Sequence, residues 1–404
     1  MTLARRPPQA DEAANAARRQ SGEPSGRRPR PAPEGLKRPP RDLRLDVLRG
    51  WMQVSIFVSH AFGTAFAWGI HAAWGVSDSS EQFVLLSGLV LGSVFSLKFA
   101  RDGFGAAWRD ILMRAARLWR MHLLVFFAFA AMVFGFDLFT PLDGVVEAGG
   151  WCWLASEPWF AIPGAMVGLY QPDFMGVLPL FVLCMLLLPG FVLLLTRFGA
   201  RALVLPWGLY VATQVFELRP PALGGTYIAF DPLAWQVLFM TGIWLGWRAL
   251  HGAAPLARPW WLVSLAVTVV LLGFWVKLSM HGFAPEMPAW VLALTDKDVL
   301  APLRLAHALS LAWLVSMLVP REARWMHQAF PQAMAAIGRN SLQVFCLGLF
   351  LSWIVAALFR LFPADRLLLD LALIPAGIMV LVAFARWREG DRSVSYREAT
   401  ARSQ

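Results

Sequence analysis

Apolar stretches of about 20 residues recur from residue 46 to residue 386, and they constrain this chain more than any other feature. A helix needs about 20 apolar residues to cross a hydrocarbon core about 30 Å thick. The chain is 58% hydrophobic and only 15% charged, whereas about a quarter of a soluble domain is charged. The short alternating strands of a membrane β-barrel are missing from the pattern. The sequence therefore predicts an all-α, polytopic membrane protein.

Ten windows have the length and composition of membrane-spanning helices. They lie at 46–70, 79–98, 118–138, 174–196, 202–217, 233–250, 260–280, 301–319, 336–358 and 366–386. The second, fourth, sixth and eighth connections between them are rich in arginine, and so is the segment after the last window. The third and seventh connections are acidic. Because positive connections stay in the cytoplasm, both termini are expected there.

The chain divides into three parts by composition. Residues 1–40 are rich in Arg and Pro without an apolar period, so they are expected to be a disordered basic tail. No apolar stretch follows their early charges, which argues against a secretory signal peptide. Residues 41–390 form the transmembrane domain and 391–404 a cytoplasmic tail. The net charge of +10 is attributed to membrane topology rather than to nucleic-acid binding.

The sequence offers no motif for a metal or a permanently bound cofactor. Cys152, Cys184 and Cys346 have neither the spacing of a metal site nor that of a disulfide framework. A Walker loop, a dinucleotide fingerprint and an HExxH motif are also missing. A pump driven by ATP hydrolysis within this chain is therefore not expected.

Arg49 and His60 lie in the first window, eleven residues apart. At 100° per residue they share one helix face, about 16 Å apart, with Gln53 on the same stripe and Asp46 just below Arg49. If Arg49 lies at one membrane surface, His60 lies near the midplane. An ionisable side chain at that depth is by default a hypothesis for a functional site. The alternative is a packing histidine that bonds to a neighbouring helix.

Three arginines, Arg114, Arg117 and Arg120, step by three residues at the expected cytoplasmic mouth of the third window. They fan over about 120° of one helix face. The planar guanidinium group suits phosphate. The alternative is that these arginines anchor the helix against anionic lipid.

The third connection, residues 138–173, carries Trp151, Trp153 and Trp159 beside several carboxylates. Aromatic rings stack on the apolar faces of sugars, and carboxylates accept hydrogen bonds from sugar hydroxyls, so this loop is a candidate acceptor platform. The alternative is an interfacial aromatic belt. His307, in the eighth window, is either a packing histidine or a second member of the site.

Several of these motifs resemble those of a known superfamily. Arg49, ten residues, then His60, followed by Arg114-Ala-Ala-Arg117, resembles the membrane acyltransferase-3 superfamily. The opening LRLDVLRGWMQVSIFVSHAF is similar to the first helix of that superfamily, and EQFVLLSGLVLG at 81–92 is similar to its second.

Within the superfamily the chain is most similar to the OpgC family, which decorates osmoregulated periplasmic glucans with succinyl groups. The segments FDPLAWQVLFMTGIWLG at 230–246 and LAPLRLAHALSLAWLV at 300–315 carry this resemblance. It covers roughly residues 41–390. The superfamily often continues its arginine pair into a proline, whereas this chain has Met121-His122.

The resemblance implies a multi-pass enzyme of the bacterial inner membrane. Its co-substrate would be a cytoplasmic acyl-coenzyme A, with succinyl-CoA expected, and its acceptor a periplasmic glucan. His60 would act as general base, for which a free pKa of about 6.5 suits it, or as a transient acyl carrier. Arg49 would bind donor charge or orient the first helix through Asp46. Arg114 and Arg117 would hold donor phosphates, with Arg117-Leu-Trp-Arg120 as a rival pair.

Further polar residues are candidates for lining such a site, and the sequence does not choose among them. Gln53, Ser59, Ser87 and Gln236 could stabilise an oxyanion, and Glu81 could orient a histidine. Two alternatives to a succinyltransferase stay open, an O-acetyltransferase of another exported polysaccharide and a transporter of an acyl donor or glycan. The acyl group, the glucan hydroxyl and the oligomeric state stay open as well.

Overall fold

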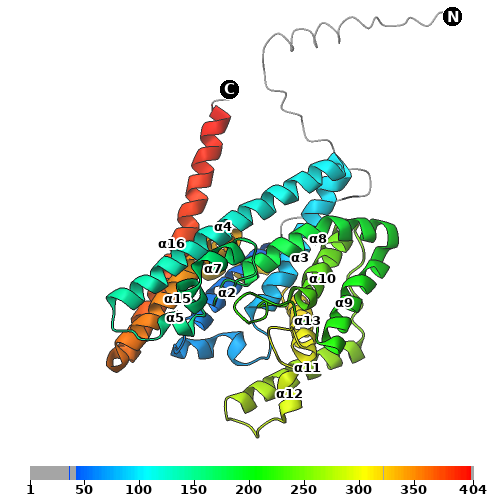
Figure 1. Cartoon of the computed structure of the whole chain (residues 1–404). Helices are drawn as coiled ribbons and strands as arrows, with labels where there is room; N and C mark the ends of the chain where they lie inside the picture. The colour runs from blue at the N-terminus through cyan, green and yellow to red at the C-terminus, as the bar shows by residue number, and fades with distance from the viewer. Residues whose placement is uncertain (1–35, 37–41, 322, 402–404) are drawn as a thin grey trace, which may run out of the picture.

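The computed structural model describes residues 36, 42–321 and 323–401 (Figure 1). Within these residues the regular structure is helical, apart from one isolated bridge between Pro221 and Tyr227. The basic tail predicted at 1–40 lies outside the described residues except for Leu36. The last helix continues to Ala401, into the segment predicted to be a tail.

Among the described residues, eleven helices of at least 11 residues build the body of the molecule. They are α2 (Leu43–His60), α3 (Ser79–Asp102), α4 (Phe104–Phe139), α8 (Val177–Phe198), α9 (Val204–Phe216), α10 (Pro232–Leu250), α11 (Trp260–Met280), α13 (Pro302–Leu318), α14 (Ala329–Arg339), α15 (Ser341–Leu361) and α16 (Arg366–Ala401). Short helices lie in the connections: η1 (Ala65–Gly69), η2 (His71–Ala73), α5 (Val145–Ala148), α6 (Cys152–Ser156), α7 (Pro158–Met166), η3 (Gly199–Leu203), α12 (Ala289–Ala293), η4 (Arg324–His327) and η5 (Pro363–Asp365).

A helix overlaps each of the ten windows, and among the described residues six helical stretches are long and apolar enough to cross a membrane. These are Ser79–Asp102, Phe104–Phe139, Val177–Phe216, Trp260–Met280, Ser341–Leu361 and Pro363–Asp391. The α2 helix, which carries Arg44, Asp46 and Arg49, is not among them. These six stretches make the protein a multi-pass helical membrane protein. The count of ten spans stays a prediction.

The connections separate into two ends of the bundle. Figure 1 shows the α3–α4 connection, the α8–α9 connection and the end of α16 toward one end, called the arginine-rich end below. The segment after α2 and the short helix α12 lie toward the opposite end, called the α12 end. The arginine-rich second and fourth connections thus lie at one end with the end of α16, as a topology set by positive charge requires. The cytoplasmic location of that end stays a prediction.

The first predicted window, 46–70, ends early. The α2 helix stops at His60, and Gly63 adopts a φ of 95°, which a helix does not allow. The Thr64 hydroxyl then donates to Asp370 Oδ1 at 2.5 Å and accepts from the Phe66 amide to start η1. His60 therefore ends a helix beside loops, and does not lie in the middle of one.

Small residues let two helix pairs approach closely. A methyl group added at Gly88 of α3 would lie 2.1 Å from the Phe239 carbonyl oxygen of α10. One added at Gly50 of α2 would lie 1.8 Å from the Met334 carbonyl oxygen of α14. Interfaces of this kind stabilise helix association in membranes through backbone contact. They fix the positions of α2 and α3, the helices that carry most of the candidate residues.

Candidate active site

A cavity of about 760 Å³ lies among α2, α3, α4, α8 and α15. Its size is typical of cavities that bind small molecules and cofactors. Arg49, Arg114 and Arg117 line one part of it, and His60, Asp78 and other residues of the α12-end loops line another. Because Arg49 and His60 lie eleven residues apart on α2, the cavity follows that helix for about 16 Å. The structure thus brings the predicted arginines and histidine to one space.

His60 lines the cavity at its α12 end. The edge of its ring meets the Phe174 ring at a centroid distance of 4.7 Å. His60 Nδ1 is buried and has no hydrogen-bond partner in the structure. Phe174 has a φ of 71°, an uncommon conformation for a bulky residue. Such conformations persist where the surroundings impose them and they cluster at functional sites.

Arg49 lies farther along the same wall. Its Nη2 donates to Ser341 Oγ at 3.2 Å, and its guanidinium carbon lies 5.9 Å from the centre of the Phe83 ring. Its Nε is buried without a partner. Asp46 is buried in α2 and lies outside the cavity lining. Sequence reasoning missed Ser341, which lies 292 residues from Arg49 in the chain.

The three arginines of α4 divide into two groups. All three side chains are exposed. Arg114 and Arg117 also line the cavity, whereas Arg120 lies outside its lining. Arg114 Nε also pairs with Asp110 at 2.9 Å, and Asp110 pairs with Lys98 at 3.1 Å. The donor-binding prediction for Arg120 therefore has no support from its position.

An ion-pair cluster holds the loops beside His60. Lys297 Nζ lies 2.6 Å and Arg304 Nη2 2.9 Å from Asp78 Oδ2, and Arg304 also pairs with Glu81. Burial alone would raise the pKa of Asp78, but the two cations outweigh it and hold that pKa well below its usual range. Glu81 also accepts from the Asp78 amide at 2.8 Å. The Glu81 carboxylate is thus bound to Arg304 and to the Asp78 amide, and Glu81 lies outside the cavity lining.

Asp78 and Lys297 line the cavity, and sequence reasoning missed both as site residues. The one available signal was that Lys297 is the only cation of an acidic connection. Their pairing across 219 residues could not be deduced from spacing.

The other polar candidates lie in different places. Ser59 and Ser87 line the cavity, and the Ser59 hydroxyl donates to the Ile56 carbonyl at 3.0 Å. Gln53 and Gln236 are buried outside the lining; Gln236 Nε2 donates to the Pro206 carbonyl at 2.8 Å. The two serines are therefore the candidates placed to stabilise an oxyanion.

His307 also lies outside the cavity lining. Its Nδ1 shares a hydrogen bond of 2.7 Å with Ser77 Oγ, and the ring packs closely against Gly75 and Gly273. This is the environment of a packing histidine. In the part of the chain that the structure describes, no group of three or more His, Cys, Asp or Glu side chains is placed to hold a metal ion.

The three tryptophans expected to form an acceptor platform do not share one surface. Trp151 is fully buried and stacks over Phe129 at a centroid distance of 5.9 Å. Trp153 is half-buried against Tyr170, and Trp159 is 86% exposed. All three lie outside the cavity lining. The segment that follows them, residues 171–174, lines the cavity instead.

The fold and the site define a class, a multi-pass helical membrane protein whose internal cavity joins a set of arginines to a histidine. The family model described as OpgC protein matches residues 41–393, so the chain belongs to the OpgC family. A comparison with curated proteins found no significant match, and neither did one with solved structures.

Proposed function

We propose that this protein is a membrane O-acyltransferase. It moves an acyl group, with succinyl expected, from cytoplasmic acyl-coenzyme A to hydroxyls of periplasmic glucans. The observation that carries the proposal is the cavity along α2, which joins the arginines of α2 and α4 to His60. OpgC family membership and the superfamily-like spacing of Arg49 and His60 support the same reaction class.

The donor would enter from the arginine-rich end. Arg114 and Arg117 offer charge-assisted bonds to the phosphates of coenzyme A, and Arg49 lines the same cavity. The pantetheine arm would then extend along α2 and bring the thioester to His60. The glucan would arrive at the α12 end, where the cavity is bounded by loops.

At the reacting centre, a ring nitrogen of His60 would remove the proton of the glucan hydroxyl while the hydroxyl oxygen attacks the thioester carbonyl. A C–O bond forms, and the carbonyl oxygen becomes an oxyanion within reach of the hydroxyls of Ser59 or Ser87. The C–S bond then breaks, and the coenzyme A thiolate takes the proton from His60. In the acyl-carrier alternative the same nitrogen attacks the thioester first and passes the acyl group to the glucan.

The test is acyl transfer by protein purified in detergent, with labelled succinyl-CoA and glucan. The wild type should yield labelled glucan, and His60→Ala should reduce the rate by roughly 10²–10⁴, the usual effect of losing a general base. His251→Ala is the matched control, because His251 is exposed and lies outside the cavity lining. A parallel reaction with acetyl-CoA tests the O-acetyltransferase alternative. A protein that forms no labelled glucan from either donor would contradict the proposal. That is the result expected of a pure transporter.

A further inference from the structure

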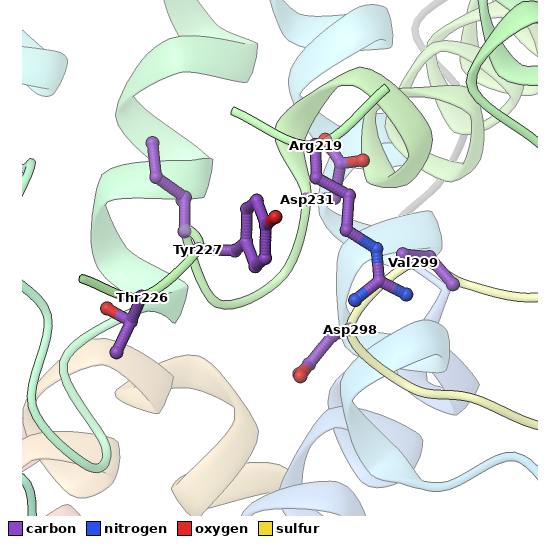
Figure 2. A pocket seen from close by; sticks show the side chains of 7 residues that line it. Arg219, Thr226, Tyr227, Asp231, Asp298 and Val299 are labelled. Atoms are coloured by element: carbon purple, nitrogen blue, oxygen red, sulfur yellow. The ribbon is translucent and has the colours of Figure 1, made fainter. Parts of the chain in front are cut away.

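A second hollow, of about 310 Å³, opens beside the cavity at the α12 end. It lies between the α9–α10 connection and the segment before α13. Figure 2 shows the side chains of Arg219, Tyr227, Asp231 and Asp298 around it. The reaction described above uses none of these four residues, although Asp231 lies in the segment 230–246 that carries the family resemblance.

The hollow shares a wall with the main cavity. Asp298 lines both spaces, and neighbouring residues of the same two segments face different sides: Phe230 and Lys297 the cavity, Asp231 and Val299 the hollow. The Asp231 amide donates to the Asp298 carbonyl at 2.8 Å and ties the segments together. A polymer bound in the hollow would therefore lie next to the space that holds His60.

Asp231 lines the hollow and carries an unsatisfied buried acceptor. The residue is only 2% exposed. Its Oδ1 accepts from the Leu233 amide at 2.9 Å and caps α10, whereas its Oδ2 is buried without a partner. A buried acceptor without a donor is costly, and buried polar groups nearly always have partners. A ligand that donates a hydrogen bond would remove that cost.

Tyr227 adds an aromatic surface to the same hollow. Its ring is 62% exposed, and the Arg219 guanidinium carbon lies 5.8 Å from the ring centre. Arg219 pairs with Asp296 at 3.5 Å, which holds the guanidinium in place. The hollow thus combines an aromatic ring, a guanidinium donor and two carboxylate acceptors. The guanidinium group disfavours a metal cation between those carboxylates, because like charges repel.

We propose that this hollow is an acceptor subsite that binds one sugar unit of the glucan, next to the unit whose hydroxyl reaches His60. The inference rests on the proposed function and names where that reaction takes its second substrate. Sugar hydroxyls donate to the carboxylates and accept from Arg219, while the ring of Tyr227 contacts the apolar face of the sugar. The subsite, and not Trp151, Trp153 and Trp159, then supplies acceptor affinity.

The test measures binding and turnover with the full-length protein in detergent. The probe is an unsubstituted glucose oligosaccharide, and the variants are Tyr227→Ala and Asp231→Asn. Asparagine caps a helix as well as aspartate does, so Asp231→Asn keeps the start of α10. Each variant should weaken oligosaccharide binding by about tenfold, the effect of one charge-assisted bond or stacked ring. The KM for glucan should rise by a similar factor, while kcat and donor affinity stay unchanged.

Two exposed tryptophans provide matched controls. Trp290→Ala removes a ring that is 69% exposed, on α12 at the same end of the molecule. Trp159→Ala removes the exposed member of the rival platform. Both should leave oligosaccharide affinity unchanged. Loss of affinity in Trp159→Ala with none in Tyr227→Ala would overturn the subsite.

The outcomes separate the subsite from the reaction. If glucan is acylated but its KM and oligosaccharide affinity are the same in the wild type, Tyr227→Ala and Asp231→Asn, the subsite is wrong and the transferase stands. If no donor yields acylated glucan, yet the wild type binds the oligosaccharide and both variants lose it, the subsite stands and the reaction is wrong. Binding of Ca²⁺ that depends on Asp231, without oligosaccharide binding, would also overturn the subsite.

Discussion

Removal of the Arg114 and Arg117 side chains should weaken donor binding by at least about thirtyfold. Both side chains line the cavity, one turn apart on α4. A hydrogen bond to a charged group contributes about 1.5–3 kcal/mol, so losing two costs about 3 kcal/mol or more, and 1.4 kcal/mol is a factor of ten. Arg114 gives up its pair with Asp110 on binding, but an exposed pair is worth under about 1 kcal/mol.

The assay is binding of a non-hydrolysable acyl-coenzyme A analogue to purified protein. Arg120→Ala is the matched control, because Arg120 lies on the same helix, has the same charge and faces away from the cavity. The double alanine variant should lose affinity, whereas Arg120→Ala should keep it. Lysine at positions 114 and 117 should restore it only partly, because lysine keeps the charge and loses the planar fork. Equal affinity in all variants would show that these arginines only orient the protein in the membrane.

Three further predictions concern stability. Gly88→Leu should lower the melting temperature in detergent, because its side chain would meet the Phe239 backbone and overpacking typically costs about 1–3 kcal/mol; an unchanged temperature would contradict the close packing. Trp151→Ala should destabilise the fold by about 3–5 kcal/mol, since its side chain is fully buried. Thermal unfolding measures this loss, and an unchanged stability is the result expected of an exposed platform residue instead. Asp78→Asn should melt below the wild type at every pH from 7 to 5. Burial raises the pKa of Asp78, but Lys297 and Arg304 outweigh it and hold that pKa well below its usual range. The ion pairs therefore persist until the pH falls through that lowered pKa. A wild type that loses stability between pH 7 and 5 through Asp78 would refute this prediction.

Helix placement could be predicted from the sequence because the apolar windows are long. The first window was wrong at its far end for a physical reason that the sequence hides. The stop after His60 is fixed by the contact between Thr64 and Asp370, which are 306 residues apart. Apolar composition continues through this turn, so the mean hydropathy of a sliding window does not show where the helix ends.

The site was predictable where it depends on helix geometry alone. The spacing of Arg49 and His60 placed both on one wall, as found. The same geometry explains Arg120, because two steps of three residues rotate by about 120° from Arg114 and leave the cavity face. Burial in loops could not be predicted: Trp151 is covered by aromatic rings of α4 such as Phe129, and composition does not distinguish it from the exposed Trp159.

In the proposed reaction, an acyl group moves within one cavity from a donor bound at the arginine-rich end to an acceptor at the α12 end. This reaction is tested most directly in proteoliposomes that enclose glucan and receive labelled succinyl-CoA only from outside. In the fraction of protein whose arginine-rich end faces outward, labelled glucan should form inside the vesicles. Vesicles with His60→Ala should form roughly 10²–10⁴ times less per unit time. Labelled donor or free glucan that crosses the membrane without any acylated glucan would contradict the account.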